Sequence, residues 1–293
     1  MNIIENLKLT YKNGNTLVKL IFFNTVVFIV IKLILIVFEL FNQDISAYVN
    51  YLAAPASFQL LIRQCWTPVT YMFMHEDFMH LFFNMLALYW FGKIFLMYYS
   101  EKQFLALYFL GGLIGVSVYV LSYNFFPYYE EFLYNSYVIG ASGAVMAIIV
   151  ADAVKSPAAE LQLLFIGKVK LIYIAIVVVL ISAFGITGKN GGGEMVHIGG
   201  ALAGYLFVVL EKKGKDITPL FNKIVDFFVN LFRFKKTPPK ARRFHSAKMS
   251  DSDFNQWKAK NEQELDKILD KIKTSGYESL TSAEKKKLFE QKR

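Results

Sequence analysis

Residues 195–211 read MVHIGGALAGYLFVVLE, and this stretch restricts the kind of fold that the chain can adopt. It is apolar apart from His197 and its last residue, and Gly200 and Gly204 have the four-residue spacing that lets membrane helices approach closely. The stretch is short for a spanning helix, which needs about 20 residues. Short helices with polar interruptions are tolerated where neighbouring helices shield them from lipid. We therefore expect an interior helix of a membrane-embedded bundle.

Five further apolar runs precede this one. They cover roughly residues 17–41, 78–99, 102–122, 138–154 and 166–186. Of the 293 residues, 55% are hydrophobic and only 19% are charged, and the mean hydropathy is +0.38. That composition excludes a disordered chain and an ordinary soluble enzyme, and the single Cys65 excludes an internal disulfide. The sequence predicts an all-α, polytopic membrane protein with a six-helix bundle.

The net charge of +9 lies in the tail. Residues 1–210 hold 11 basic and 11 acidic residues, whereas residues 211–293 hold 21 basic and 12 acidic residues. Positive segments beside membrane helices stay on the cytoplasmic side and attract anionic lipid. We interpret the tail as cytoplasmic and in contact with the lipid bilayer, and we expect no nucleic-acid partner. Six crossings then leave both termini cytoplasmic, as in a bacterial inner-membrane protein.

The charge and hydropathy patterns divide the chain into four segments. They are a cytoplasmic N-terminal segment (1–16), the six-helix membrane domain (17–212), an amphipathic interfacial helix with a linker (213–249) and a small helical hairpin (250–293). In the hairpin, Gly276 is placed to end a first helix, and Thr281 with Glu284 forms a capping-box pattern ahead of a second. So small a hairpin has little core, which favours a partner or self-association.

Polar residues in three of the runs lie at one depth. Ser142 and His197 lie 15 residues before Pro157 and Lys212, and Asn84 lies at a similar distance from the inner end of its run. At about 1.5 Å per residue, each is about 22 Å above the inner boundary of a core about 30 Å thick. The second, fourth and sixth runs travel in the same direction. Their polar side chains are therefore expected to converge on one site near the outer face.

The residue types at this level suit nucleophilic catalysis. A serine hydroxyl becomes a nucleophile when an imidazole within hydrogen-bond reach takes its proton, which assigns those roles to Ser142 and His197. Ser142 would begin a helix, where free N–H groups favour a tetrahedral oxyanion. His80 and Asn84 share a helix face and can donate further hydrogen bonds to it.

The motifs at these positions define a resemblance. They are the HxxxN pair His80 and Asn84, the G-x-S-G element with Gly140, Ser142 and Gly143, and His197 followed by the packing glycines Gly200 and Gly204. With them the chain resembles the rhomboid family of intramembrane serine proteases over roughly residues 17–212. The resemblance implies a Ser142–His197 dyad without an acidic third member. It also implies an oxyanion site at His80 and Asn84, transmembrane protein substrates, and no cofactor or metal.

Two positions depart from the family pattern. Thr67 follows Trp66 where the family often has arginine, which puts the usual packing of the first loop (residues 42–77) in doubt. Met146 stands where an aromatic residue often stacks on the histidine, so the orientation of His197 must come from elsewhere. The resemblance also makes the Gly-rich residues 185–193 a mobile cap over the site.

Three alternatives remain open. A catalytically silent rhomboid-like protein would bind transmembrane clients, although the presence of both Ser142 and His197 argues against it. A transporter would use the same groups as a proton path, but buried acidic residues are expected only at run ends. A zinc site at His75, His80 and His197 lacks a carboxylate or thiol at ligand spacing. Lys32, inside the first run, either snorkels or faces inward.

Overall fold

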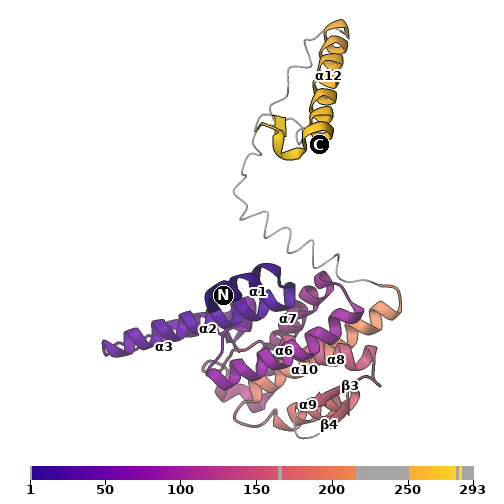
Figure 1. Cartoon of the computed structure of the whole chain (residues 1–293). Coiled ribbons are helices and arrows are strands. Elements are labelled where there is room, and N and C mark those ends of the chain that lie inside the picture. The colour runs from indigo at the N-terminus through magenta and orange to yellow at the C-terminus, as the bar shows by residue number, and fades with distance from the viewer. Residues whose placement is uncertain (1, 164–166, 216–218, 220–250, 282–283, 286–293) are drawn as a thin grey trace. The chain divides into compact units, whose positions relative to one another are not determined.

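The computed structural model describes residues 2–163, 167–215, 219, 251–281 and 284–285. The chain divides into two compact units, residues 1–230 and residues 231–293. Six helices of the first unit match the six apolar runs in position (Figure 1): α2 (Thr16–Leu40), α6 (Phe78–Tyr98), α7 (Glu101–Phe125), α8 (Ser142–Lys155), α9 (Leu171–Gly185) and α10 (Gly191–Lys212). A short helix, α1 (Ile3–Asn13), precedes them.

Helices dominate the described residues, as predicted. Four of them, α2, α6, α7 and α10, are long and apolar enough to cross a membrane. Helix α9 is apolar but has 15 residues, and α8 has 14. Strands in the described part of the chain form two antiparallel pairs, β1 (Ala54–Pro55) with β2 (Tyr137–Val138) and β3 (Glu160–Leu163) with β4 (Gly167–Lys170). A helical membrane protein is thus confirmed, whereas the number of crossings stays a prediction.

Three helix boundaries differ from the apolar runs. The fourth run was predicted to begin at residue 138, but Val138 belongs to β2 and α8 begins only at Ser142. The fifth run was predicted from residue 166, yet residues 167–170 form β4, because lysines alternate there with other residues at the two-residue period of a strand. Helix α10 begins before its apolar run, at Gly191.

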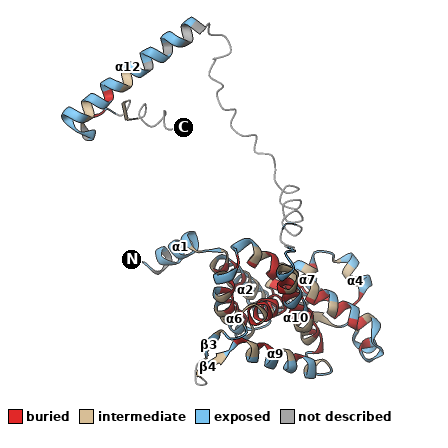
Figure 2. Ribbon diagram, turned by 90° about the vertical axis from the view of Figure 1, so that its right-hand side faces the viewer, coloured by how far each residue is buried: buried red, intermediate tan, exposed pale blue. Residues whose placement is uncertain are grey.

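Helix α8 forms the centre of the bundle. Every residue from Gly143 to Ala153 is buried, and α7 and α10 are its main neighbours. Figure 2 shows buried residues gathered on these inner helices, while much of α9 is exposed. Apolar side chains that point outward, such as Ile181 and Phe184 of α9, are suited to lipid.

Helices α8 and α10 lie side by side and run in the same direction. A Cβ atom at Gly200 would overlap the carbonyl oxygen of Gly143, and one at Gly204 would overlap that of Ala147. Contact positions therefore advance together by four residues on both helices. This confirms the prediction that the fourth and sixth runs are parallel and that glycines bring them close.

The loop before α6 contains α3 (Ser46–Val49), η1 (Asn50–Leu52), α4 (Phe58–Arg63), α5 (Thr67–Thr70) and η2 (Tyr71–Phe73). This first loop is anchored by other contacts, although Thr67 stands where the family often has arginine. Trp66 Nε1 donates to the carbonyl of Tyr51 at 2.8 Å, and Thr70 Oγ1 donates to that of Leu52 at 2.8 Å. Thr67 itself is fully buried. Strand β1 then ties the loop to the segment that leads into α8.

In the second unit, α12 (Asp251–Ser275) is followed by η5 (Tyr277–Ser279). Gly276 adopts a φ of 77°, which suits its predicted place at the end of the helix. Thr281 N donates to Glu284 Oε2 at 2.7 Å, and Glu284 N donates back to Thr281 Oγ1 at 3.4 Å, so the predicted capping box forms. Most of the predicted interfacial helix, and the helix expected after residue 284, lie outside the described residues.

Candidate active site

Ser142 is presented by a turn between β2 and α8. Gly140 has a φ of 124°, which residues with a side chain rarely adopt, and its N–H donates to the carbonyl of Tyr71 at 2.9 Å. Ser142 is the first residue of α8, where the backbone N–H groups have no partner within the helix. Its side chain is partly exposed, unlike the buried residues that follow. The turn therefore exposes a hydroxyl at a helix N-terminus.

His80 lies against the same turn. A Cβ atom at Gly140 would lie 2.7 Å from His80 Nε2 and 3.6 Å from Ser142 Oγ, so both polar atoms flank this glycine. The other ring nitrogen of His80, Nδ1, accepts the N–H of Glu76 at 3.4 Å. A neutral imidazole that accepts at Nδ1 carries its proton on Nε2. His80 is thus oriented to donate a hydrogen bond beside the serine.

Asn84 follows His80 by one helical turn. It is buried, and its Nδ2 donates to the carbonyl of His80 at 2.8 Å. The two residues share one face of α6, as predicted. One N–H of Asn84 is already used within its own helix, which leaves the other for a ligand.

His197 lies on α10, one turn before the contact of Gly200 with Gly143. The structure shows no hydrogen bond between the described side chains of Ser142 and His197. His197 Nδ1 is instead 3.1 Å from Ser182 Oγ and 3.1 Å from Glu194 Oε2. An acidic side chain therefore lies beside His197, and a dyad without an acidic third member stays a prediction.

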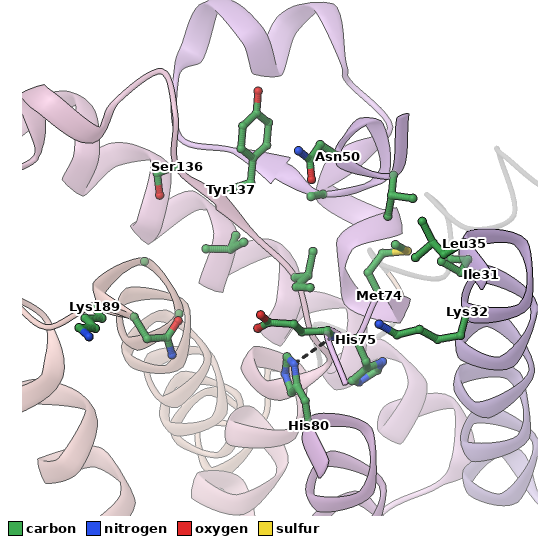
Figure 3. Close-up of a pocket in the computed structure, with 18 of the residues that line it drawn as sticks. Ile31, Lys32, Leu35, Asn50, Met74, His75, His80, Ser136, Tyr137 and Lys189 are labelled. Carbon is green, nitrogen blue, oxygen red and sulfur yellow. Dashed lines mark hydrogen bonds between the residues drawn. The ribbon is translucent and has the colours of Figure 1, made fainter. Parts of the chain in front are cut away.

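A cavity of about 540 Å³ opens beside His80. It is lined by residues of α2, of the first loop, of β2 and of the start of α10, as Figure 3 shows. Lys189 and Asn190, from the predicted cap, contribute to its wall. Tyr128 and Tyr129 tie the same segment to η3 (Pro127–Phe132), because their hydroxyls donate to the carbonyls of Thr187 and Ile186 at 2.8 Å each. Mobility of the cap stays a prediction.

Lys32 is one of the cavity residues. It reaches from α2 toward His75 in Figure 3, and its Nζ lies 5.8 Å from the centre of the Phe28 ring. Of the two readings of this lysine, the structure favours the inward-facing one.

His75 lines the cavity, and the centre of its ring is 5.1 Å from the centre of the His80 ring. Burial, together with the neighbouring His80, lowers the pKa of His75 to about 4. It is therefore neutral at physiological pH. In the described parts of the chain, no three His, Cys, Asp or Glu side chains are grouped closely enough to hold a metal ion, so the zinc alternative gains no support.

Sequence reasoning missed three residues. Glu194 could have been found, because residues three apart on a helix are neighbours. Ser182 could not, because it reaches His197 from another helix. Asp152 was treated as a run-end residue, but it is fully buried, and neither carboxylate oxygen has a hydrogen-bond partner among the described residues.

Together, the bundle and these polar groups define a polytopic membrane protein with a Ser/His site near one end of its helices. The family model of the Rhomboid domain matches residues 62–213, which is over half of the chain. The protein therefore belongs to the rhomboid family. A second model, for a family of unknown function, matches residues 249–291.

A curated relative agrees with the family assignment. The chain is 26% identical over 191 residues to RHOMBOID-like protein 12, mitochondrial, from Arabidopsis thaliana. The similar region covers 62% of this chain and 56% of the plant protein. The chain thus matches little more than half the length of that relative.

Proposed function

We propose that the chain is an intramembrane serine endopeptidase that cleaves transmembrane segments of other proteins. The observation that carries this proposal is the backbone contact between α8 and α10. Because Gly143 and Gly200 touch, Ser142 and His197 lie on adjacent parallel helices at nearly the same level. Rotation of the serine side chain about one bond is the kind of adjustment that forms catalytic hydrogen bonds when a substrate binds.

In this mechanism, His197 Nε2 takes the proton of Ser142 while Oγ attacks the carbonyl carbon of the substrate. The negative charge on the carbonyl oxygen is stabilised by the Ser142 N–H at the helix N-terminus, by His80 Nε2–H and by the free N–H of Asn84. His197 then gives the proton to the leaving amine, and water hydrolyses the acyl-enzyme. The cavity beside His80 brings open space up to one of these oxyanion donors.

We further propose six crossings with both termini on the cytoplasmic side, because the basic residues gather in the tail. The substrate is a membrane protein and the tail contacts anionic lipid. The proposal requires no cofactor and no nucleic acid.

Labelling with a fluorophosphonate probe tests the nucleophile directly. The wild type in detergent micelles should be labelled, and Ser142→Ala should not be. Ser117→Ala is the matched control, because the Ser117 hydroxyl donates to the Leu113 carbonyl of its own helix. Equal labelling of the wild type and Ser142→Ala would overturn the assignment.

A second candidate function is the capture of transmembrane clients without cleavage. The absence of a hydrogen bond between Ser142 and His197, both of which the structure describes, favours it. A wild type that crosslinks to a transmembrane peptide in liposomes but neither cleaves it nor reacts with the probe would establish this function instead.

A further inference from the structure

We propose that Glu194 is a positioning residue of His197. Its carboxylate orients the imidazole and stabilises its charged form, and Ser182 is an auxiliary partner of the same ring nitrogen. This inference rests on the proposed function. It gives the chain an acidic group that the family resemblance does not imply.

The geometry around Nδ1 carries the inference. Glu194 Oε2 lies 3.1 Å from His197 Nδ1, and Ser182 Oγ lies at the same distance. The side chains of His197 and Glu194 are 21% and 17% exposed, so water competes little for this contact. Both residues are on α10, three apart, and therefore stay on one face of a rigid helix.

The carboxylate is itself held in place. A Cβ atom at Gly185 would lie 2.9 Å from Glu194 Cγ, so the end of α9 leaves room for this side chain and confines it. The end of α9 thus limits the rotamers of Glu194 while its carboxylate contacts His197.

The chemical consequence concerns the tautomer. A carboxylate only accepts hydrogen bonds, so its contact with Nδ1 requires the proton of a neutral imidazole to be on Nδ1. Nε2 is then the unprotonated atom that accepts the proton of Ser142. When it does so, the negative charge of Glu194 stabilises the imidazolium that forms.

The methionine at position 146 gives His197 a need for a partner such as Glu194 that orients its ring. The aromatic residue that often stacks on the histidine in the resembling family is replaced by this buried methionine. A thioether side chain cannot fix the plane of an imidazole ring as a stacked ring does. Nδ1–H donates to Glu194 on the same helix and is also close to Ser182 on α9, and these contacts fulfil that orienting role.

A structural role for Glu194 has to be separated from this one. An acidic residue in the first turn of a helix stabilises the helix without any part in the reaction. The tautomer of His197 distinguishes the two roles, because helix stability alone does not change it.

The first test compares cleavage of a transmembrane substrate in liposomes by the wild type, Glu194→Gln and Ser182→Ala. Glu194→Gln keeps the shape but removes the charge, so kcat should fall by about 10- to 1,000-fold with little change in KM. Ser182→Ala should lower kcat by only a few fold. Glu131→Gln, which changes an exposed carboxylate in η3, is the matched control.

The second test reads the imidazole directly and does not depend on turnover. The chain has only 4 histidines, so ¹⁵N resonances of labelled protein in micelles can be assigned by substitution. Neutral His197 should carry its proton on Nδ1 in the wild type and shift toward Nε2 in Glu194→Ala. An unchanged tautomer, in an enzyme that cleaves, would overturn this inference and leave the proposed function standing. A wild type that neither cleaves nor reacts with the probe would overturn the proposed function, and this inference with it.

Discussion

Helices α10 and α9 flank the same site but are built in opposite ways. Helix α10 presents glycines to its neighbours and touches α8 backbone to backbone, whereas α9 presents large apolar side chains to its surroundings and has few buried residues. The close contact sets the spacing of Ser142 and His197, and the loose one only adds Ser182 to it. The relative positions of Ser142 and His197 therefore depend on small residues in the helix contact. The large apolar side chains of α9 are mainly suited to contact with lipid.

The largest effect should follow from adding one methyl group to the close contact. In Gly200→Ala the new Cβ overlaps the Gly143 carbonyl, so α10 must shift away from α8. Overpacking of this kind costs about 1–3 kcal/mol, and a displacement of about 1 Å can cost about 100-fold in rate. Thermal unfolding in detergent and cleavage in liposomes measure the two effects.

The matched control adds bulk to the loose helix. Ala183 is exposed on α9, so Ala183→Val should leave both the unfolding temperature and the rate near the wild-type values. If Gly200→Ala and Ala183→Val behaved alike, the contrast between the two helices would be wrong.

A smaller effect is expected at the turn that presents the serine. Gly140→Ala places a side chain at a φ of 124° and 2.7 Å from His80 Nε2. The backbone strain costs of order 1–3 kcal/mol. We expect slower labelling by the fluorophosphonate probe, with a moderate fall in unfolding temperature. Labelling at the wild-type rate would show that the contact of this turn with His80 does not matter for reactivity.

The smallest effect should follow from shortening one exposed side chain on α9. Ile181 is 62% exposed on α9, so Ile181→Ala removes few contacts within the protein. The unfolding free energy should change by no more than about 0.5 kcal/mol. A loss above about 2 kcal/mol, measured by unfolding in mixed micelles, would mean that α9 packs as tightly as α10.

The helices were readable from sequence because their signals are local, whereas the catalytic roles of Ser142 and His197 stay predictions. Long apolar runs locate helices, and the spacing of Gly200 and Gly204 indicates a close parallel contact. The helix boundaries were less accurate, since hydropathy does not separate the strand residues 167–170 from the start of α9. Ser182 escaped notice because nothing local marks a serine that meets a histidine from another helix. The complete burial of Asp152 also depends on tertiary packing.

The hydrogen bond from Gly140 to Tyr71 has a mechanical consequence. It joins the turn that carries Ser142 to the first loop, and the pairing of Ala54 with Val138 joins the same two segments a second time. These two links couple the first loop to the turn between β2 and α8. A displacement of the first loop would therefore also displace Ser142, so that the two segments move together.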